Sequence, residues 1–271
     1  MSLPAAGLSR ARYGSQTLHA EWTKLRTLAS TGWLLLAVAV LTIAVSAAAD
    51  ASATCQSGGC QTDPAKLSLT GVQVGQAIVA IVAVLAVSNE YSSGMIQVTL
   101  TAVPRRLTVL AAKAALIGGL FLAAGAVAVL ASVLAGRLIL PGHGFTPAHG
   151  DQPLPLGDGL VLRAACGSVL YLVLIAWLSV GVATAVRESA VAIGLVLGLL
   201  YVFPAVAGVA GNQQWHRHLE QIGPATAGLY IQDTVDVPAL PLTPWQGLGV
   251  LALWAAGALT VGALVLRLRD A

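Results

Sequence analysis

The stretch Asn-Glu-Tyr-Ser-Ser-Gly-Met-Ile-Gln-Val-Thr-Leu-Thr-Ala-Val-Pro-Arg-Arg, residues Asn89 to Arg106, separates two long apolar runs. The runs 67–89 and 114–136 each have 23 residues and contain no Asp, Glu, Lys or Arg. As helices they are about 34 Å long, enough to cross a hydrocarbon core of about 30 Å. Because that core does not tolerate exposed polar backbone, the polar stretch must lie at a face of the membrane.

The rest of the chain has the same character. Hydrophobic residues make up 57% of it and charged residues only 9%, against about 25% in soluble domains. The charge-free runs predict an all-α membrane protein with six transmembrane helices. The expected spans are about 32–49, 67–89, 114–136, 164–186, 191–209 and 245–265. Pro204 is expected to kink or end the fifth span.

The positions of Lys and Arg predict the orientation. With the N-terminus inside, ten of these residues fall on the cytoplasmic side and four outside, so both termini are expected in the cytoplasm. Asp50 is then expected in the first outer loop. A rival interpretation is that Ala47-Ala48-Ala49 marks a signal-peptidase site after the first apolar run.

Residues 1–31 form the predicted cytoplasmic N-terminus, and 32–271 the transmembrane domain. Leu18, Trp22, Leu25 and Ala29 recur at helical spacing, with charged residues between them. This pattern favours an amphipathic helix in the membrane interface over a simple extension of the first span.

The polar stretch carries helix signals of its own. Ser92 or Ser93 can cap a helix start, and Pro104 must end the helix. One weakly apolar face is expected, formed by Met95, Ile96, Thr99, Leu100 and Val103. That face requires either lipid or a groove on another protein, and periodicity does not distinguish the two.

Glu90 to Arg106 resembles the first cytoplasmic loop of exporter-type (type-2) ABC-transporter permeases. The segment 19–26, His-Ala-Glu-Trp-Thr-Lys-Leu-Arg, is similar to that family's N-terminal motif, and 243–245 and 267–271 resemble its last span and end. The resemblance covers essentially the whole chain. Gln97 departs from it, since a basic residue is expected there.

The resemblance implies the membrane-spanning permease subunit of an exporter in the bacterial cell membrane. ATP and Mg²⁺ would bind a separate ATPase subunit, and a second permease, identical or homologous, would complete the pathway. The stretch would be a coupling helix docked on the ATPase. Its expected coupling residues are Glu90, Ser93, Met95, Ile96, Gln97, Leu100, Val103, Arg105 and Arg106.

The chain itself lacks the motifs for ATP binding or hydrolysis. It has no Gly-x-x-x-x-Gly-Lys-Ser/Thr, no His-Glu-x-x-His and no Gly-x-Ser-x-Gly. No metal site is expected, since His216 and His218 of the most His-rich stretch would point to opposite sides of a helix. The residues 215–222 instead predict a small amphipathic helix. The chain has no basic stripe of the kind that binds nucleic acid, so no nucleic-acid partner is expected.

Several single residues carry further expectations. Gln73 and Gln76, one turn apart in the second span, either line a substrate path or bond to a neighbouring helix. Cys55 and Cys60 flank a Gly-Gly turn and are expected to form a disulfide outside the cell. Lys113 is expected to extend to the inner surface.

Two glycine pairs have a small-x-x-x-small spacing, which lets helices approach closely: Gly71 with Gly75, and Gly194 with Gly198. Two other classes of function remain as alternatives, a membrane-embedded enzyme and a secondary transporter. Both would usually need ionisable groups inside the spans, and the charge-free runs offer none.

Overall fold

The computed structural model describes residues 29–54, 62–93, 106–146, 154, 157–209, 213–235 and 237–268. Within these ranges it is helical and has no strand. Six helices are long and apolar enough to cross a membrane, as the sequence predicts. The N-terminal interfacial helix, the coupling helix and the Cys55–Cys60 pair lie outside the described residues.

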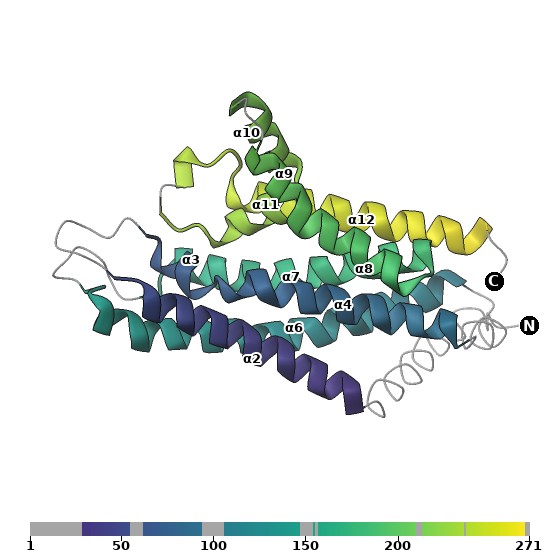
Figure 1. Cartoon of the computed structure of the whole chain (residues 1–271), viewed down its shortest axis with the longest axis horizontal. Coiled ribbons are helices and arrows are strands. Elements are labelled where there is room, and N and C mark those ends of the chain that lie inside the picture. The colour runs from purple at the N-terminus through teal and green to yellow at the C-terminus, as the bar shows by residue number, and fades with distance from the viewer. Residues whose placement is uncertain are drawn as a thin grey trace, which may run out of the picture.

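The elements follow one another along the chain as α2 (Ala29–Ser52), α3 (Pro64–Ser68), α4 (Gly71–Ser92), α6 (Arg106–Ile139), η1 (Leu140–His143), α7 (Gly159–Val186), α8 (Ser189–Leu197), the π-helical turn η3 (Gly198–Val202), α9 (Phe203–Val209), α10 (Gln213–Ile222), α11 (Pro224–Leu229), η4 (Tyr230–Gln232), η5 (Val237–Ala239) and α12 (Pro244–Leu268). The long helices lie side by side (Figure 1).

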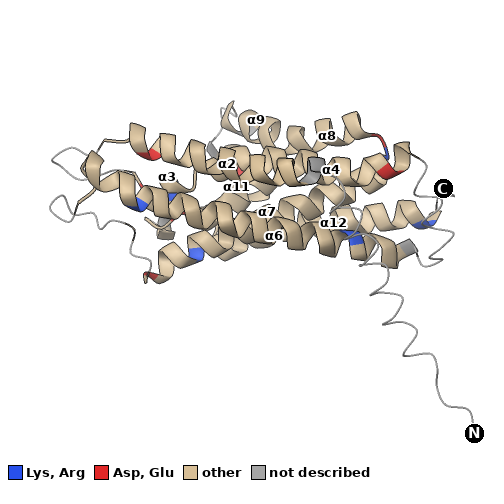
Figure 2. Cartoon of the chain, turned by 90° about the horizontal axis from the view of Figure 1, so that it is seen from below, with Lys and Arg blue, Asp and Glu red and all other residues tan. Residues whose placement is uncertain are grey.

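The charged residues that the structure describes lie mostly near the two ends of this bundle, and the length between is almost free of them (Figure 2). We call the end that holds Glu90, Lys113 and Arg187 the Glu90 end. The end that holds Asp63 and Lys66 is the Asp63 end. The helix α2 begins and α12 ends at the Glu90 end (Figure 1). This is what an even number of spans requires.

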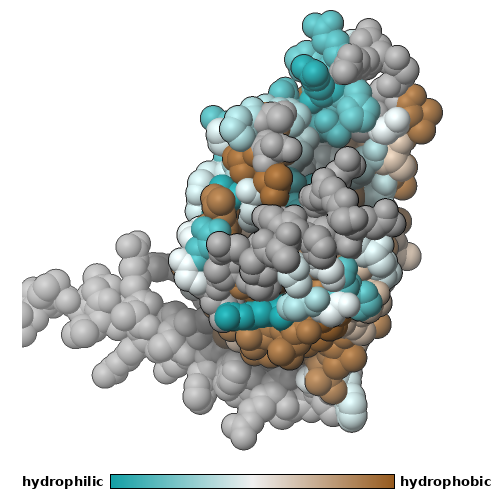
Figure 3. Space-filling view, turned by 90° about the vertical axis from the view of Figure 1, so that its left-hand side faces the viewer, coloured by the Kyte–Doolittle hydropathy of each residue, from teal (hydrophilic) through white to brown (hydrophobic). Residues whose placement is uncertain are grey.

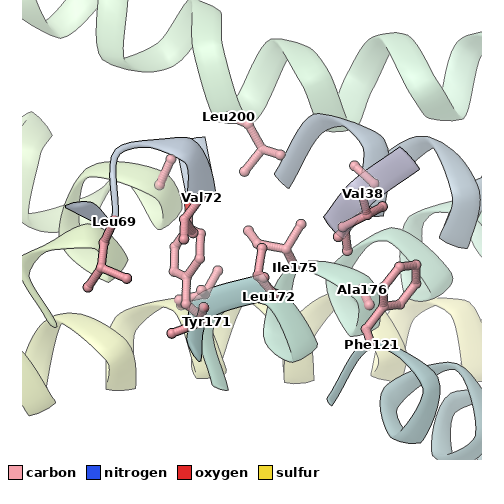
Figure 4. Close-up of a cluster of buried hydrophobic side chains, with 14 of the residues drawn as sticks. Val38, Leu69, Val72, Phe121, Tyr171, Leu172, Ile175, Ala176 and Leu200 are labelled. Atoms are coloured by element: carbon pink, nitrogen blue, oxygen red, sulfur yellow. The ribbon is translucent and has the colours of Figure 1, made fainter. Parts of the chain in front are cut away.

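The helix α7 lies at the centre, packed against α4, α6, α8 and α12. Its side chains Tyr171, Leu172 and Ile175 are fully buried. They belong to one buried apolar cluster with Val38 of α2, Val72 of α4 and other residues of the surrounding helices (Figure 4). The core is therefore built around one helix that is buried on most of its faces.

Glycines allow two of the close helix contacts. A Cβ at Gly71 would overlap the backbone of Thr42 in α2, and one at Gly75 would overlap the Thr42 hydroxyl. The first expected glycine pair is therefore a real helix contact. Gly194 and Gly198 face open space, so the second prediction is wrong for the contacts within this chain.

The fifth span is irregular where the sequence contains proline. The π-helical turn η3 directly precedes α9, which contains Pro204. Proline has no N–H to donate, so an irregular turn N-terminal to it is expected. The predicted helix near 215–222 is present as α10, and hydrophilic residues gather over it (Figure 3).

Candidate functional site

The expected coupling segment is described only at its two ends. Glu90 and Ser93 belong to the described residues, and Arg106 is the first residue of α6. The side chain of Arg106 is not described. The remaining expected coupling residues lie outside the described part of the chain, namely Met95, Ile96, Gln97, Leu100, Val103 and Arg105.

Ser93 ends the helix α4. Its N–H donates to the Asn89 carbonyl oxygen at 3.1 Å, and its Oγ donates to the same oxygen at 2.7 Å. The hydroxyl of Ser92 also donates to this carbonyl, at 3.1 Å. Both hydroxyls thus add hydrogen bonds to a carbonyl oxygen that already accepts the Ser93 N–H in the last turn. The last turn of α4 is therefore hydrogen-bonded up to Ser93, where the expected coupling segment begins.

Glu90 and Lys113 form an ion pair just before this helix end. The Glu90 Oε2 lies 2.5 Å from the Lys113 Nζ, and the two side chains are only 9% and 7% exposed. Lys113 also lies 3.4 Å from the Ala86 carbonyl oxygen, to which it donates. Lys113 is buried between helices at the Glu90 end, where Glu90 offers it a counter-charge. Its expected extension to the inner surface stays a prediction.

A second contact joins the same region to the turn between α7 and α8. The Arg187 guanidinium lies 5.5 Å from the centre of the Tyr91 ring, a cation–π geometry. Arg187 ends α7 in the left-handed region, with φ of 65°, and its N–H donates to Ala183. Its Nε and Nη2 are buried and bond to no other described residue.

These contacts join three parts of the bundle at the ends of residues 94–105. The Glu90–Lys113 pair connects α4 with α6, and the Tyr91–Arg187 contact connects α4 with the α7–α8 turn. A force on the chain between α4 and α6 would therefore act on several helices together. Sequence reasoning missed the pair, although a Glu before one membrane face and a Lys after it were available as a signal.

The two glutamines of α4 have different surroundings. Gln76 is buried, and its Oε1 accepts a hydrogen bond from the Tyr171 hydroxyl of α7. Gln73 has an exposed side chain, and its carbonyl oxygen accepts a hydrogen bond from the Tyr201 hydroxyl. For Gln76 the helix–helix bond is present. The side chain of Gln73 is exposed, so Gln73 remains the candidate for lining a substrate path.

Asp50 lies in α2 and not in an outer loop, which corrects the sequence interpretation. Its side chain is fully buried, and its Oδ1 accepts a hydrogen bond from Ser68 Oγ at 3.0 Å. The Oδ2 is buried without a hydrogen-bond partner among the described residues. The apolar run ends before Asp50, but the helix continues because a single charged residue does not interrupt backbone hydrogen bonds.

A salt bridge, a helix cap and further hydrogen bonds hold the Asp63 end together. Lys66 Nζ lies 2.6 Å from Asp233 Oδ1, and Arg163 of α7 donates to the Asp233 carbonyl oxygen. Asp63 caps α3 and accepts from Thr234 and Val235. The segment 230–235 is thereby bound to α3 and α7. This network consists of structural contacts and contains no recognisable catalytic arrangement of the described residues.

The histidines of α10 make one local contact. His216 Nδ1 lies 3.4 Å from Glu220, one helical turn away. The described part of the chain contains no group of three metal-ligating side chains.

A scan against protein-family models gives no match to this chain, and a search of curated proteins gives none either. Its function must therefore be argued from the residues and their geometry.

Proposed function

We propose that this chain is the membrane-spanning permease subunit of an ATP-driven exporter of the type-2 ABC class. It would work in a bacterial cell membrane with a separate ATPase subunit, which binds ATP and Mg²⁺. The chain itself would carry out no chemical reaction. A second permease, either a copy of this chain or a homologous one, would form the pathway with it.

The observation that carries the proposal is the buried Glu90–Lys113 ion pair beside the segment that resembles a coupling helix. A docked coupling helix can drive transport only if its displacement also moves the transmembrane helices. Removing one partner of a buried ion pair costs about 3–5 kcal/mol, so such a pair resists separation. It would make the ends of α4 and α6 move together when an ATPase displaces the segment between them.

The exposed side chain of Gln73 supports the second permease. Gln73 lies within a candidate membrane span, and an amide is costly against lipid without partners. A pathway at the junction of two permeases would give it water or protein partners. Gln76, bonded to Tyr171, would hold the helix that presents Gln73.

The test uses the affinity-tagged chain purified from its native membranes, where the proposed ATPase subunit would be present. We expect the two to co-purify from membranes and to hydrolyse ATP. The double variant Ile96→Asp/Leu100→Asp should lower co-purification and ATPase activity at least about tenfold, since charge on the apolar face opposes burial in a groove. Ile222→Asp, on α10, places the same charge at another exposed apolar position and should change neither. Unchanged activity in the double variant would rule out the coupling role.

One observation favours a second candidate, a secondary transporter. Asp50 is a fully buried carboxyl group in a candidate span, and such groups often bind coupling ions. In that case, purified chain in proteoliposomes would move substrate along an ion gradient without any ATPase. Asp50→Asn would abolish that movement, whereas an ATP-driven exporter would retain its ATP dependence in this variant.

A further inference from the structure

An apolar groove opens on the side of the bundle between α7, η3 and α12. It has a volume of about 640 Å³, within the range of about 300–1,000 Å³ that is typical of small-molecule sites. Its walls include Leu178 and Val182 of α7, Leu199 of η3, and Trp254, Gly257 and Val261 of α12. All three elements belong to candidate membrane spans, so we expect the groove to open toward lipid.

The depth of the groove can be estimated from Arg267, which is exposed in the last turn of α12. Val261 lies six residues before it and Leu253 fourteen, which is about 9 Å and about 21 Å along a helix. One leaflet contributes about 15 Å of hydrocarbon, half of a core of about 30 Å. The groove therefore lies beside the acyl chains of the leaflet at the Glu90 end and reaches the membrane centre.

One wall residue of the groove is held by a hydrogen bond outside it. Trp254 belongs to its wall, and the indole Nε1 of this residue donates to the Ile222 carbonyl oxygen at 2.9 Å. The polar atom of the ring is thereby satisfied, and its apolar face is left for the groove. Nearer the end of α12, Leu264 and Leu268 continue the same face of this helix and are 54% and 82% exposed. An apolar track thus leads from the groove to the level of Arg267.

We propose that this groove binds one acyl chain of an anionic phospholipid, whose phosphate lies against Arg267. The hydrocarbon tail matches the apolar walls, and the guanidinium matches the negative headgroup. Lipid tails are as apolar as the groove, so tail burial alone gives no preference among lipids. A preference for anionic lipid would therefore have to come from Arg267. The proposal does not depend on an ATPase partner.

The glycines of α12 allow a matched test. A Cβ at Gly257 or at Gly249 would meet nothing within 4 Å, so both positions accept a larger side chain. Only Gly257 belongs to the groove wall. Gly257→Phe should fill the groove, and Gly249→Phe should add the same side chain to α12 without filling it. Arg267→Gln removes the proposed headgroup contact, and Arg137→Gln removes an exposed arginine of α6 elsewhere.

The readout is native mass spectrometry of the purified chain after incubation with an equal mixture of phosphatidylglycerol and phosphatidylcholine. We expect one retained phosphatidylglycerol per chain, preferred about fivefold, the factor typical of one basic residue near a membrane surface. Gly257→Phe should lose the retained lipid and Gly249→Phe should keep it. Arg267→Gln should retain lipid without preference, and Arg137→Gln should keep the preference.

Three results would overturn the proposal. The first is equal lipid retention by wild type and Gly257→Phe. The second is a preference that survives Arg267→Gln, which also decides the matter if Gly257→Phe does not fold. The third is a change in oligomeric mass in Gly257→Phe with lipid retention unaltered, since the groove would then hold a second copy of the chain.

Discussion

Lys113 is a cation near one end of a long apolar helix, and Glu90 is what makes its burial tolerable. Lys113→Met leaves the Glu90 carboxylate without its partner and should destabilise the protein by about 3–5 kcal/mol. The double variant Glu90→Gln/Lys113→Met should recover most of this loss, because it leaves no buried charge. Thermal unfolding of the three proteins in one detergent measures the difference. Equal stability of the single and double variants would contradict it.

Ionisation of Tyr230 should make the stability of the folded chain fall at high pH. Burial raises the pKa of Tyr230 to about 12, and the negative charges of Glu220 and Asp233 add to this effect. The folded state therefore holds the phenol proton more tightly than the unfolded state, whose pKa is near 10. The stability from this group is complete below pH 10 and is lost as the pH rises from 10 to 12.

The expected measurement is the melting temperature of wild type and Tyr230→Phe across this pH range. The variant lacks the ionisable group, so its melting temperature should fall less than that of wild type between pH 10 and 12. A constant offset between the two curves would mean that only the hydroxyl contacts of Tyr230 matter, and not its titration.

At the scale of elements, Asp63 has two roles that can be separated. Its Oδ1 caps α3 by accepting from Ala65 and Lys66, and both of its oxygens accept from the 234–235 backbone or the Thr234 hydroxyl. Asp63→Ala removes both roles and should cost about 2–4 kcal/mol. Amide hydrogen exchange should also rise in residues 230–235, because they are no longer bound to α3.

Asp158→Ala is the control for the capping role alone. Asp158 caps α7 by accepting from Leu160 at 3.1 Å, and its substitution should cost about 1 kcal/mol without loosening residues 230–235. If both variants lost the same stability, the contacts of Asp63 with Thr234 and Val235 would contribute little.

For the whole molecule, the lysine and arginine distribution predicts which end faces the cytoplasm. Leu268→Cys at the Glu90 end and Val235→Cys at the Asp63 end are exposed positions for single reporters in a background without the native cysteines. A thiol reagent that does not cross membranes should label Val235→Cys in intact cells and Leu268→Cys only after the cells are opened. The reverse pattern would invert the predicted orientation and remove the coupling proposal with it.

The six spans were predictable because almost every charged residue that the structure describes lies near an end of the bundle. The charge-free runs therefore mark the spans directly. Helix ends were less predictable: α6 begins at Arg106, well before the run that starts at 114, since charged residues are compatible with helical backbone. Asp50 shows the same effect at the end of α2.

Contacts between distant residues could not be predicted from periodicity. Gly71 packs against α2 whereas Gly194, with the same spacing signal, faces open space, because the neighbours of each helix decide the matter. The pairing of Glu90 with Lys113 depends likewise on the ends of two spans meeting. The sequence singled out residues 89–106 as the candidate site, and this stays a prediction; the structure supplied the ion pair that lies beside that segment.

The π-helical turn η3 holds one residue more per hydrogen-bonded ring than an α-helical turn. The fifth span therefore contains a place where chain length can vary. Deleting one residue there should turn η3 into ordinary α-helix while α8 and α9 keep their positions. The same deletion inside α7 would rotate all later residues of that helix by about 100°, so its core side chains would no longer face the helices they pack against. Insertions and deletions among natural relatives of this chain should accordingly gather at 198–202.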